Sequence, residues 1–308
     1  MNQYQKKLFS GICYALASGL VWGASGIFGE YFFKHYSVTT GWITSMRLIV
    51  AGLVFLLLAF RQAGWRIFDI WRERKNVLPF TFYALAGIFS VQFFFYLCIQ
   101  ESNAATATIL QFTSPIFMLG YHFFFLKQPV SKTALLYVFL AMAGVFLMTT
   151  KGDISQITLT PLALLGGFMS ALAMTLNAIL PRSFAKKYGL IPTIGWGMFA
   201  AGLFSNLFAP LPLLPFQPDL KSLAISLIIA LFGTALAFLL SLKAVSLVSP
   251  LIVTVLGASE PLSSAVFSTL FLGLKLDLPL ILAMILVVIP MVFLSLEEGK
   301  KSEDQPIS

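Results

Sequence analysis

The stretch FSGICYALASGLVWGASGIFGEYFF, residues 9–33, is long and apolar enough to cross a membrane as a single helix. A helix needs about 20 mostly apolar residues to cross a hydrocarbon layer about 30 Å thick. Nine further stretches of the same kind follow along the chain, with short links between them, at residues 41–60, 77–99, 104–126, 133–150, 161–184, 191–214, 222–243, 250–273 and 278–296. We therefore expect an all-α polytopic membrane protein with ten transmembrane helices.

The composition agrees with this class of protein. Hydrophobic residues make up 58% of the 308 residues and charged residues only 10%, which a soluble domain of this size would not show. No link is long enough to fold as a separate soluble domain, so any function must be built from the helices. The first apolar stretch is too long, and too continuous with the next, for a removable signal peptide.

The basic residues predict the orientation in the membrane. If the N-terminus lies inside, ten spans return the C-terminus to the inside, and the inner segments then hold 15 Lys and Arg residues against 4 in the outer loops. Cytoplasmic loops carry an excess of such residues. We therefore expect both termini in the cytoplasm. The cationic residues flank the spans and form no separate basic domain, so no nucleic-acid partner is expected.

Short matches between the two halves of the chain indicate an internal repeat. Ala51-Gly52-Leu53 recurs 150 residues later as Ala201-Gly202-Leu203, and Ser114-Pro115 is matched 146 residues later by Glu260-Pro261. Chance matches in apolar sequence are the alternative explanation. The repeat predicts two domains, residues 1–150 and 151–308, of five spans each. Because five is odd, the second domain must cross the membrane in the opposite sense, as in transporters with inverted repeats.

Several of these segments resemble a known family. The stretch ASGLVWGAS at residues 17–25, Met46-Arg47-Leu48, the Ala-rich stretch 104–115 and Glu260-Pro261 are similar to the EamA-domain branch of the drug/metabolite transporter superfamily. The resemblance covers nearly the whole chain as two tandem copies. It implies ten helices in a bacterial cytoplasmic (inner) membrane and export or exchange of small metabolites, often amino acids or related compounds.

The chain departs from this family at two positions. The family usually places a glutamate after the fourth and ninth spans, but this chain has Lys127-Gln128-Pro129 and Gly273-Leu274-Lys275 there. A role for those acids is therefore not carried over to this chain.

Glu260 is predicted near the centre of the ninth span. An ionised acid at that depth is costly unless it is paired, hydrated or protonated, so such residues usually face the bundle interior or an aqueous cavity. Glu260 is therefore a candidate for contacting a substrate ammonium or for coupling transport to protons. The alternative is a structural acid that caps the broken backbone before Pro261.

Glu30 and Arg47 are the candidate residues of an outer vestibule. They lie at similar predicted depths near the outer ends of the first two spans, which favours an ion pair between them. The alternative is that the long side chain of Arg47 reaches the outer headgroups.

Other side chains at or near mid-depth complete the set of candidate cavity residues. Polar groups there either line a substrate path or bind a neighbouring helix. The set consists of Trp22, Ser25, Gln92, Tyr96, Gln111, Ser114, Ser170, Thr175 and Asn177. We expect a midplane cavity walled by spans 1, 3, 4, 6, 8 and 9, the last two by analogy with the family.

The sequence contains no recognisable catalytic constellation. The two histidines, His35 and His122, are predicted at opposite faces, and no nucleotide-binding or metal-ligand motif is present. We therefore expect no enzyme activity, no metal and no cofactor. The sequence favours a transporter that moves a small polar metabolite by alternating access, with the lipid bilayer as its surroundings and protons as a candidate coupling ion. The alternatives are a membrane scaffold or regulator that does not transport, and an intramembrane enzyme.

Overall fold

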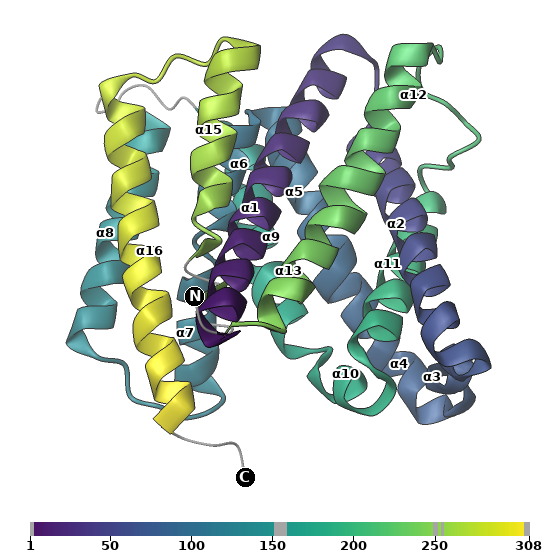
Figure 1. The fold of residues 1–308 in the computed structure, drawn as a ribbon. Helices are drawn as coiled ribbons and strands as arrows, with labels where there is room; N and C mark the ends of the chain where they lie inside the picture. Colours follow the sequence, from purple (N-terminus) through teal and green to yellow (C-terminus); the bar gives the residue numbers. More distant parts are fainter. Residues whose placement is uncertain (1–2, 151–158, 249–251, 254–255, 305–308) are drawn as a thin grey trace.

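The computed structural model describes residues 3–150, 159–248, 252–253 and 256–304, and this part of the chain contains helices and no strands. The helices stand side by side in one bundle (Figure 1). Their bounds are α1 Gln3–His35, α2 Thr40–Ala63, η1 Gly64–Phe68, α3 Asp69–Arg72, α4 Arg74–Phe82, η2 Tyr83–Phe89, α5 Ser90–Glu101, α6 Ala104–Gln111, α7 Ser114–Phe124, α8 Lys132–Thr150, α9 Pro161–Ile179, α10 Arg182–Tyr188, α11 Leu190–Asn206, α12 Leu220–Leu227, η3 Ile228–Leu236, α13 Ala237–Val245, α15 Ser259–Leu272 and α16 Leu278–Asp304.

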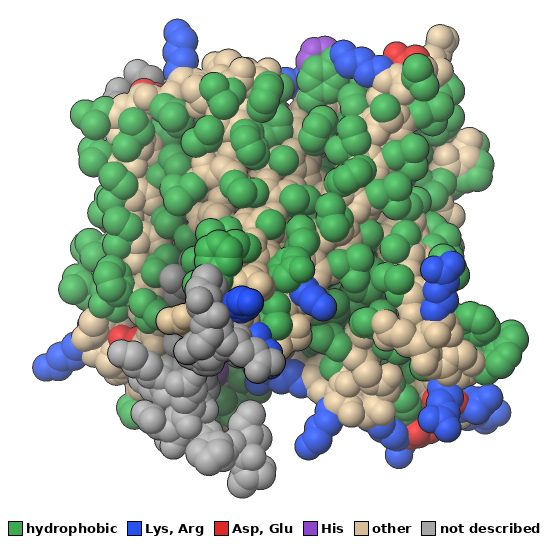
Figure 2. Space-filling view, in the orientation of Figure 1, with side chains coloured by type: hydrophobic (Ala, Val, Ile, Leu, Met, Phe, Trp, Pro, Cys, Tyr) green, Lys and Arg blue, Asp and Glu red, His purple; other side chains and the backbone are tan. Residues whose placement is uncertain are grey.

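The bundle has two ends, which we name after short helices found there (Figure 1). At the α12 end, α1 finishes and α12 begins. At the α10 end lie α3 and α10, together with the start of α1 and the finish of α16. Apolar side chains cover most of the face drawn in Figure 2, and charged side chains gather towards its two ends. This distribution fits a bundle whose middle faces lipid.

Two glycines let α2 and α11 pack at very short range. A Cβ atom on Gly52 would lie 2.6 Å from the backbone nitrogen of Phe199, and a Cβ on Gly202 would lie 2.7 Å from the backbone nitrogen of Ile49. Small residues of this kind allow the backbones of membrane helices to approach closely. The two contacts are reciprocal, since each glycine meets the partner helix three residues before the partner's own glycine.

Two of the expected spans are interrupted near a proline. The span predicted at 104–126 is not one helix, because it divides into α6 and α7 at Phe112 and Thr113, with Pro115 in the first turn of α7. Proline lacks the N–H that a continuous helix would need, so a helix start is where it is tolerated. The span predicted at 250–273 contains α15, which begins at Ser259 and carries Pro261 in its first turn; residues 250–251 and 254–255 of that span lie outside the described residues.

Two other predicted spans end earlier as helices than expected, and in each a proline lies near the end. The span at 191–214 is too long, since α11 ends at Asn206 and Pro210 and Pro212 follow. The span at 161–184 ends as a helix at Ile179, and a new short helix, α10, begins after Pro181.

Six helical segments of the described chain are long and apolar enough to cross a membrane. They are Gln5–His35, Thr40–Arg72, Arg74–Glu101, Pro161–Tyr188, Leu220–Val245 and Leu278–Glu297, and Lys132–Met148 is a shorter apolar helix. The chain is thus polytopic, while ten crossing helices and their inverted arrangement stay predictions.

Two of the long helices contain a π-helical stretch in place of regular α-helix. These stretches, η2 and η3, include Ala84-Leu85-Ala86-Gly87 and Ala230-Leu231-Phe232-Gly233, which are 146 residues apart. Such stretches are rare and often occur at functional sites. The residues packed against η2 and η3 are therefore candidates for a functional site.

We expect Gly52→Ala to destabilise the bundle, because its Cβ would collide with backbone that cannot move aside as a side chain can. Overpacking of this kind costs about 1–3 kcal/mol. The measurement is the thermal unfolding midpoint of the purified protein in detergent. Gly120→Ala is the control, since a Cβ there meets nothing within 4 Å. Equal midpoints for the two variants would contradict the close packing of α2 and α11.

Candidate functional site

Arg47 on α2 is buried in the middle of the bundle, with only 3% of its surface exposed. Its Nε donates a hydrogen bond to Oγ1 of Thr234 at 2.9 Å, and its Nη2 donates to the carbonyl of Gly233 at 3.3 Å. Both acceptors belong to η3. A buried guanidinium is costly unless it is paired and hydrogen-bonded. The π-helical stretch therefore supplies polar partners to a charge that lies among apolar helices.

An aromatic ring and an acid complete the surroundings of this charge. The guanidinium carbon of Arg47 lies 4.8 Å from the ring centroid of Tyr96 on α5, a cation–π distance. Glu260 interacts electrostatically with Arg47 without forming a direct ion pair with it in the described structure. Glu260 lies in the first turn of α15, where the positive end of a helix dipole favours a negative charge. We call Arg47, Tyr96, Thr234 and Glu260 the central charged site.

Helix α1 passes close both to α15, which carries Glu260, and to η3, which binds Arg47. A Cβ on Gly23 would lie 2.8 Å from the carbonyl oxygen of Glu260, and a Cβ on Gly233 would lie 2.0 Å from the hydroxyl oxygen of Ser25. In the described structure, the hydroxyls of Ser25, Ser259 and Ser264 are buried without a hydrogen-bond partner. Buried polar groups normally have a partner. These hydroxyls therefore supply hydrogen-bonding capacity that a bound ligand or water could use.

The predicted ion pair between Glu30 and Arg47 is wrong. Glu30 accepts hydrogen bonds from Nζ of Lys34 at 2.7 Å and from the backbone N–H of Ala104, which opens α6, at 2.8 Å. Arg47 is bound to η3 instead. Depth along two helices does not fix the direction in which each side chain points, and here the two point to different partners.

Four of the predicted cavity residues form contacts between helices. Gln111 donates to Ser170, which donates to the carbonyl of Val91 at 3.1 Å. Thr175 donates to the carbonyl of Ser114 at 3.1 Å. These bonds tie α9 to α5, α6 and α7.

The remaining predicted residues are spread over other places. Trp22 is half-buried and packs edge-on against Phe238 with ring centroids 5.3 Å apart. Gln92 is buried on α5, four residues before Tyr96. Asn177 lines a cavity near the α10 end, so the structure does not bring the whole predicted set to one place.

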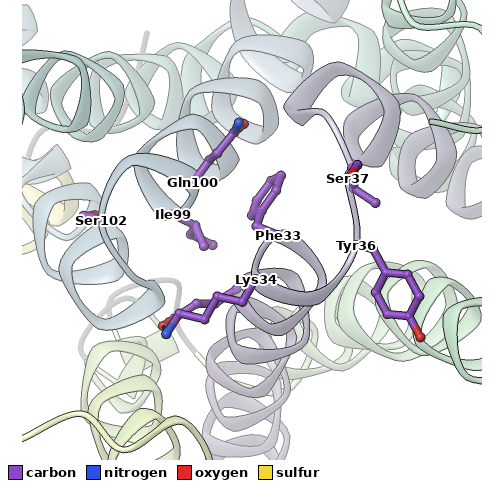
Figure 3. A pocket seen from close by; sticks show the side chains of 9 residues that line it. Phe33, Lys34, Tyr36, Ser37, Ile99, Gln100 and Ser102 are labelled. Atoms are coloured by element: carbon purple, nitrogen blue, oxygen red, sulfur yellow. Dashed lines mark hydrogen bonds and ion pairs between the residues drawn. The ribbon is translucent and has the colours of Figure 1, made fainter. Parts of the chain in front are cut away.

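Each end of the bundle has a cavity. The first, of about 310 Å³, lies at the α12 end and is drawn in Figure 3, where Phe33 projects between Ile99 and the Tyr36–Ser37 segment. Its lining residues are Glu30, Phe33, Lys34, Tyr36, Ser37, Val38, Ile99, Gln100 and Ser102. The second, of about 230 Å³, is more apolar and is lined by Tyr83, Ile88, Asn177, Ala178, Pro181, Arg182, Ala185, Leu190, Ile194 and Phe238. Neither cavity is lined by Arg47 or Glu260, so the two cavities lie at the ends of the bundle and apart from the central charged site.

Sequence reasoning missed Gly233 and Thr234 as partners of Arg47. A signal was present, because Thr234 is the one hydroxyl residue in the apolar run from 227 to 240. Its hydroxyl also donates to the carbonyl of Ile229 at 2.9 Å, a bond that spans five residues as the π-helix does.

We expect Arg47 and Glu260 to be energetically coupled. Arg47→Gln leaves Glu260 without its nearby positive charge, and adding Glu260→Gln should recover part of the lost stability. Coupled neighbours show interaction energies of about 0.5–3 kcal/mol in a double-mutant cycle of unfolding midpoints. The matched control cycle combines Arg47→Gln with Glu30→Gln, for which we expect additive effects. Coupling in the control cycle but none with Glu260 would refute this view of the site.

Comparison with known proteins agrees with a transporter. The EamA-like transporter family matches the chain twice, over residues 9–150 and 161–296. The "Uncharacterized inner membrane transporter YicL" of Salmonella typhimurium (strain LT2) is 31% identical over 300 residues, covering 95% of this chain and 97% of that protein. The "Threonine/homoserine exporter RhtA" of Escherichia coli (strain K12) is 29% identical over 238 residues, covering 75% of this chain and 73% of RhtA. A solved crystal structure of 14% sequence identity covers 96% of this chain and 99% of its own, with a TM-score of 0.65, which shows likeness of fold alone. With its apolar helices, this multi-pass inner membrane protein belongs to the EamA-like transporter family.

Proposed function

We propose that this transporter exports or exchanges a small zwitterionic metabolite, such as an amino acid, by alternating access at the central charged site. The observation that carries the proposal is the buried Arg47, which has an acid nearby but no direct ion pair with it in the described structure. A zwitterion could bind with its carboxylate at Arg47 and its ammonium at Glu260. Arg suits carboxylates because its planar fork of donors matches their two oxygens.

The surroundings of the site support a polar substrate. The hydroxyls of Ser25, Ser259 and Ser264 lack partners in the described structure and lie on the two helices that meet at Glu260. The relative RhtA is named for the export of threonine and homoserine, which are zwitterions. That name supports the class of substrate and the direction for this chain without identifying the compound.

The proposal includes ten membrane helices arranged as two inverted repeats, residues 1–150 and 151–308. Support comes from the two family matches and from the reciprocal contacts of Gly52 and Gly202. Pro115 and Pro261, each in the first turn of a helix that follows an interruption, are 146 residues apart, and the stretches η2 and η3 begin 145 residues apart. Broken helices with a half-helix N-terminus aimed at the substrate are a recurrent feature of transporters with inverted repeats.

The proposal places both chain termini and the α10 end in the cytoplasm. Helices α3, α4 and α10 hold Arg72, Arg74, Lys75, Arg182, Lys186 and Lys187 at the α10 end. The α12 end holds Lys34 of α1, Lys221 of α12 and Lys275 in the link between α15 and α16. The excess of positive charge at the α10 end supports this orientation.

Transport by cells with and without the protein tests the function. We expect cells that express it to release at least one amino acid faster than cells without it, and Arg47→Ala to abolish the difference. The surface expression of each variant must be measured alongside. No change in the release or uptake of any zwitterionic metabolite would favour a scaffold or regulator that does not transport.

Glu260 is also the candidate for proton coupling, which a separate measurement tests. Glu260→Gln keeps the shape of the side chain but cannot take up a proton. In reconstituted vesicles, this variant should still exchange substrate but should lose accumulation driven by an imposed pH gradient. Full accumulation by the variant would exclude the coupling role, whereas a misfolded variant would favour the structural role beside Pro261.

A further inference from the structure

Two contacts between a tyrosine and a carboxylate lie at opposite ends of the bundle. At the α12 end, the hydroxyl of Tyr36 donates to Oδ1 and Oδ2 of Asp219 at 3.1 and 3.2 Å. At the α10 end, the hydroxyl of Tyr188 donates to Oε1 of Glu73 at 2.8 Å. Each contact joins residues that are more than 100 positions apart in the sequence.

The carboxylates of the two contacts occupy corresponding positions of the two halves, and the tyrosines, 152 residues apart, occupy similar places at helix ends. Glu73 and Asp219 are 146 residues apart, the spacing that also relates Pro115 to Pro261. Each carboxylate residue immediately precedes a helix, α4 or α12, and each of these helices leads directly into a π-helical stretch. Each tyrosine lies at or just after the end of a helix, α1 or α10. The resemblance therefore extends to the helices that each contact connects.

In each half of the chain, a lysine follows the carboxylate residue by two positions. Lys187 donates to Oε1 of Glu73 at 2.5 Å, and Lys75 lies 3.3 Å from Oε2. At the other end, Lys221 donates to the hydroxyl of Tyr31 and lies 4.7 Å from its ring centroid. Lys75 and Lys221 are again 146 residues apart.

We infer that Tyr36–Asp219 and Tyr188–Glu73 are the two gates of the transport cycle, one for each end of the bundle. Each contact lies beside the cavity at its own end, since Tyr36 lines the first cavity and α10 lines the second with Arg182 and Ala185. When the Tyr36–Asp219 contact breaks, the start of α12 is released from the end of α1. When the Tyr188–Glu73 contact breaks, the start of α4 is released from α10. This inference rests on the alternating access proposed above.

The gate at the α12 end is connected to the central charged site by a continuous helix. Asp219 precedes α12, which continues into η3, where Gly233 and Thr234 accept the hydrogen bonds of Arg47. A ligand that draws Arg47 away from η3 would therefore act on the helix that Asp219 holds. This supplies a physical route from substrate binding to gate opening.

The chemistry of the contacts suits a gate that opens repeatedly. The hydrogen bonds from Lys187 and Tyr188 lower the pKa of Glu73 to about 2, and those from Ser222 lower the pKa of Asp219, so both carboxylates stay ionised at neutral pH. Exposed charged contacts of this kind contribute little net stability. Each can therefore break without unfolding the bundle, and both are closed in this structure.

Reporter cysteines in the purified full chain, reconstituted in lipid nanodiscs, test the gates, because both ends are then open to a membrane-impermeant thiol reagent. Ile99→Cys reports on the cavity at the α12 end and Ile194→Cys on the cavity at the α10 end, and both positions are buried. We expect Tyr36→Phe to raise the labelling rate of the Ile99→Cys reporter by roughly 3- to 10-fold, the effect of losing one modest hydrogen bond. The Ile194→Cys reporter should stay unchanged or react more slowly.

Tyr188→Phe should give the mirror result, with faster labelling of the Ile194→Cys reporter and no gain at Ile99→Cys. All variants carry Cys13→Ala and Cys98→Ala, and Tyr137→Phe on α8 is the control that should change neither rate. Equal acceleration at both reporters, or at neither, would overturn the assignment. The readout needs no substrate, so amino-acid transport with unchanged labelling refutes the gates alone, and the expected labelling without amino-acid transport refutes only the proposed substrate.

Discussion

The burial of one positive charge, Arg47, constrains the arrangement of the helices around it. A guanidinium removed from water needs polar partners on several sides, and α2 alone cannot supply them. The bundle provides them from η3, through Thr234 and the Gly233 carbonyl, and from the ring of Tyr96. Because Gly233 has no side chain, Ser25 of α1 also comes close to this point. The positions of α1, α2, α5 and η3 are thus linked to the same charge.

Glycines allow the helices around Arg47 and Glu260 to pack backbone against backbone, and such contacts do not prevent the helices from moving past one another. Gly52 and Gly202 let α2 and α11 touch along their backbones, and Gly23 brings α1 against the start of α15. Contacts between backbones and small side chains lack the interlocking that large side chains give. Helices that meet in this way can slide or tilt with little repacking, which is what alternating access requires of the helices beside a substrate.

The sequence predicted the class of the protein well, because span length and composition depend only on the thickness of a membrane. Helix breaks were less predictable: Pro115 was noted as part of the internal repeat, but the division of the fourth span into two helices was not expected. Partners of buried polar groups were least predictable. Glu30 and Arg47 have similar depths, yet the first binds Lys34 and the second binds a helix nearly 190 residues away in the sequence. The direction of a side chain around its helix depends on packing between distant segments, which spacing along one helix does not contain.

The same dependence on packing explains why only some of the polar residues predicted to line a cavity lie near the central charged site. Gln111, Ser170 and Thr175 satisfy each other or nearby carbonyls, as polar groups in a low-dielectric interior must. The hydroxyl of Ser25 instead has no partner in the described structure, and neither has the hydroxyl of Ser259, the residue before Glu260. Sequence alone shows that all these groups are polar and at mid-depth, but the pairing that separates structural contacts from a candidate binding site exists only in the folded bundle.

Equilibrium binding to the purified protein tests the central claim most directly, namely that Arg47 and Glu260 together hold a zwitterion. The ligands are amino acids, the corresponding α-hydroxy acids that lack the ammonium, and the corresponding amines that lack the carboxylate, measured by calorimetry at one pH and salt concentration. At least one amino acid should bind, and both of its singly charged analogues should bind at least tenfold more weakly. Equal binding of an amino acid and either analogue would contradict a site that recognises both charges.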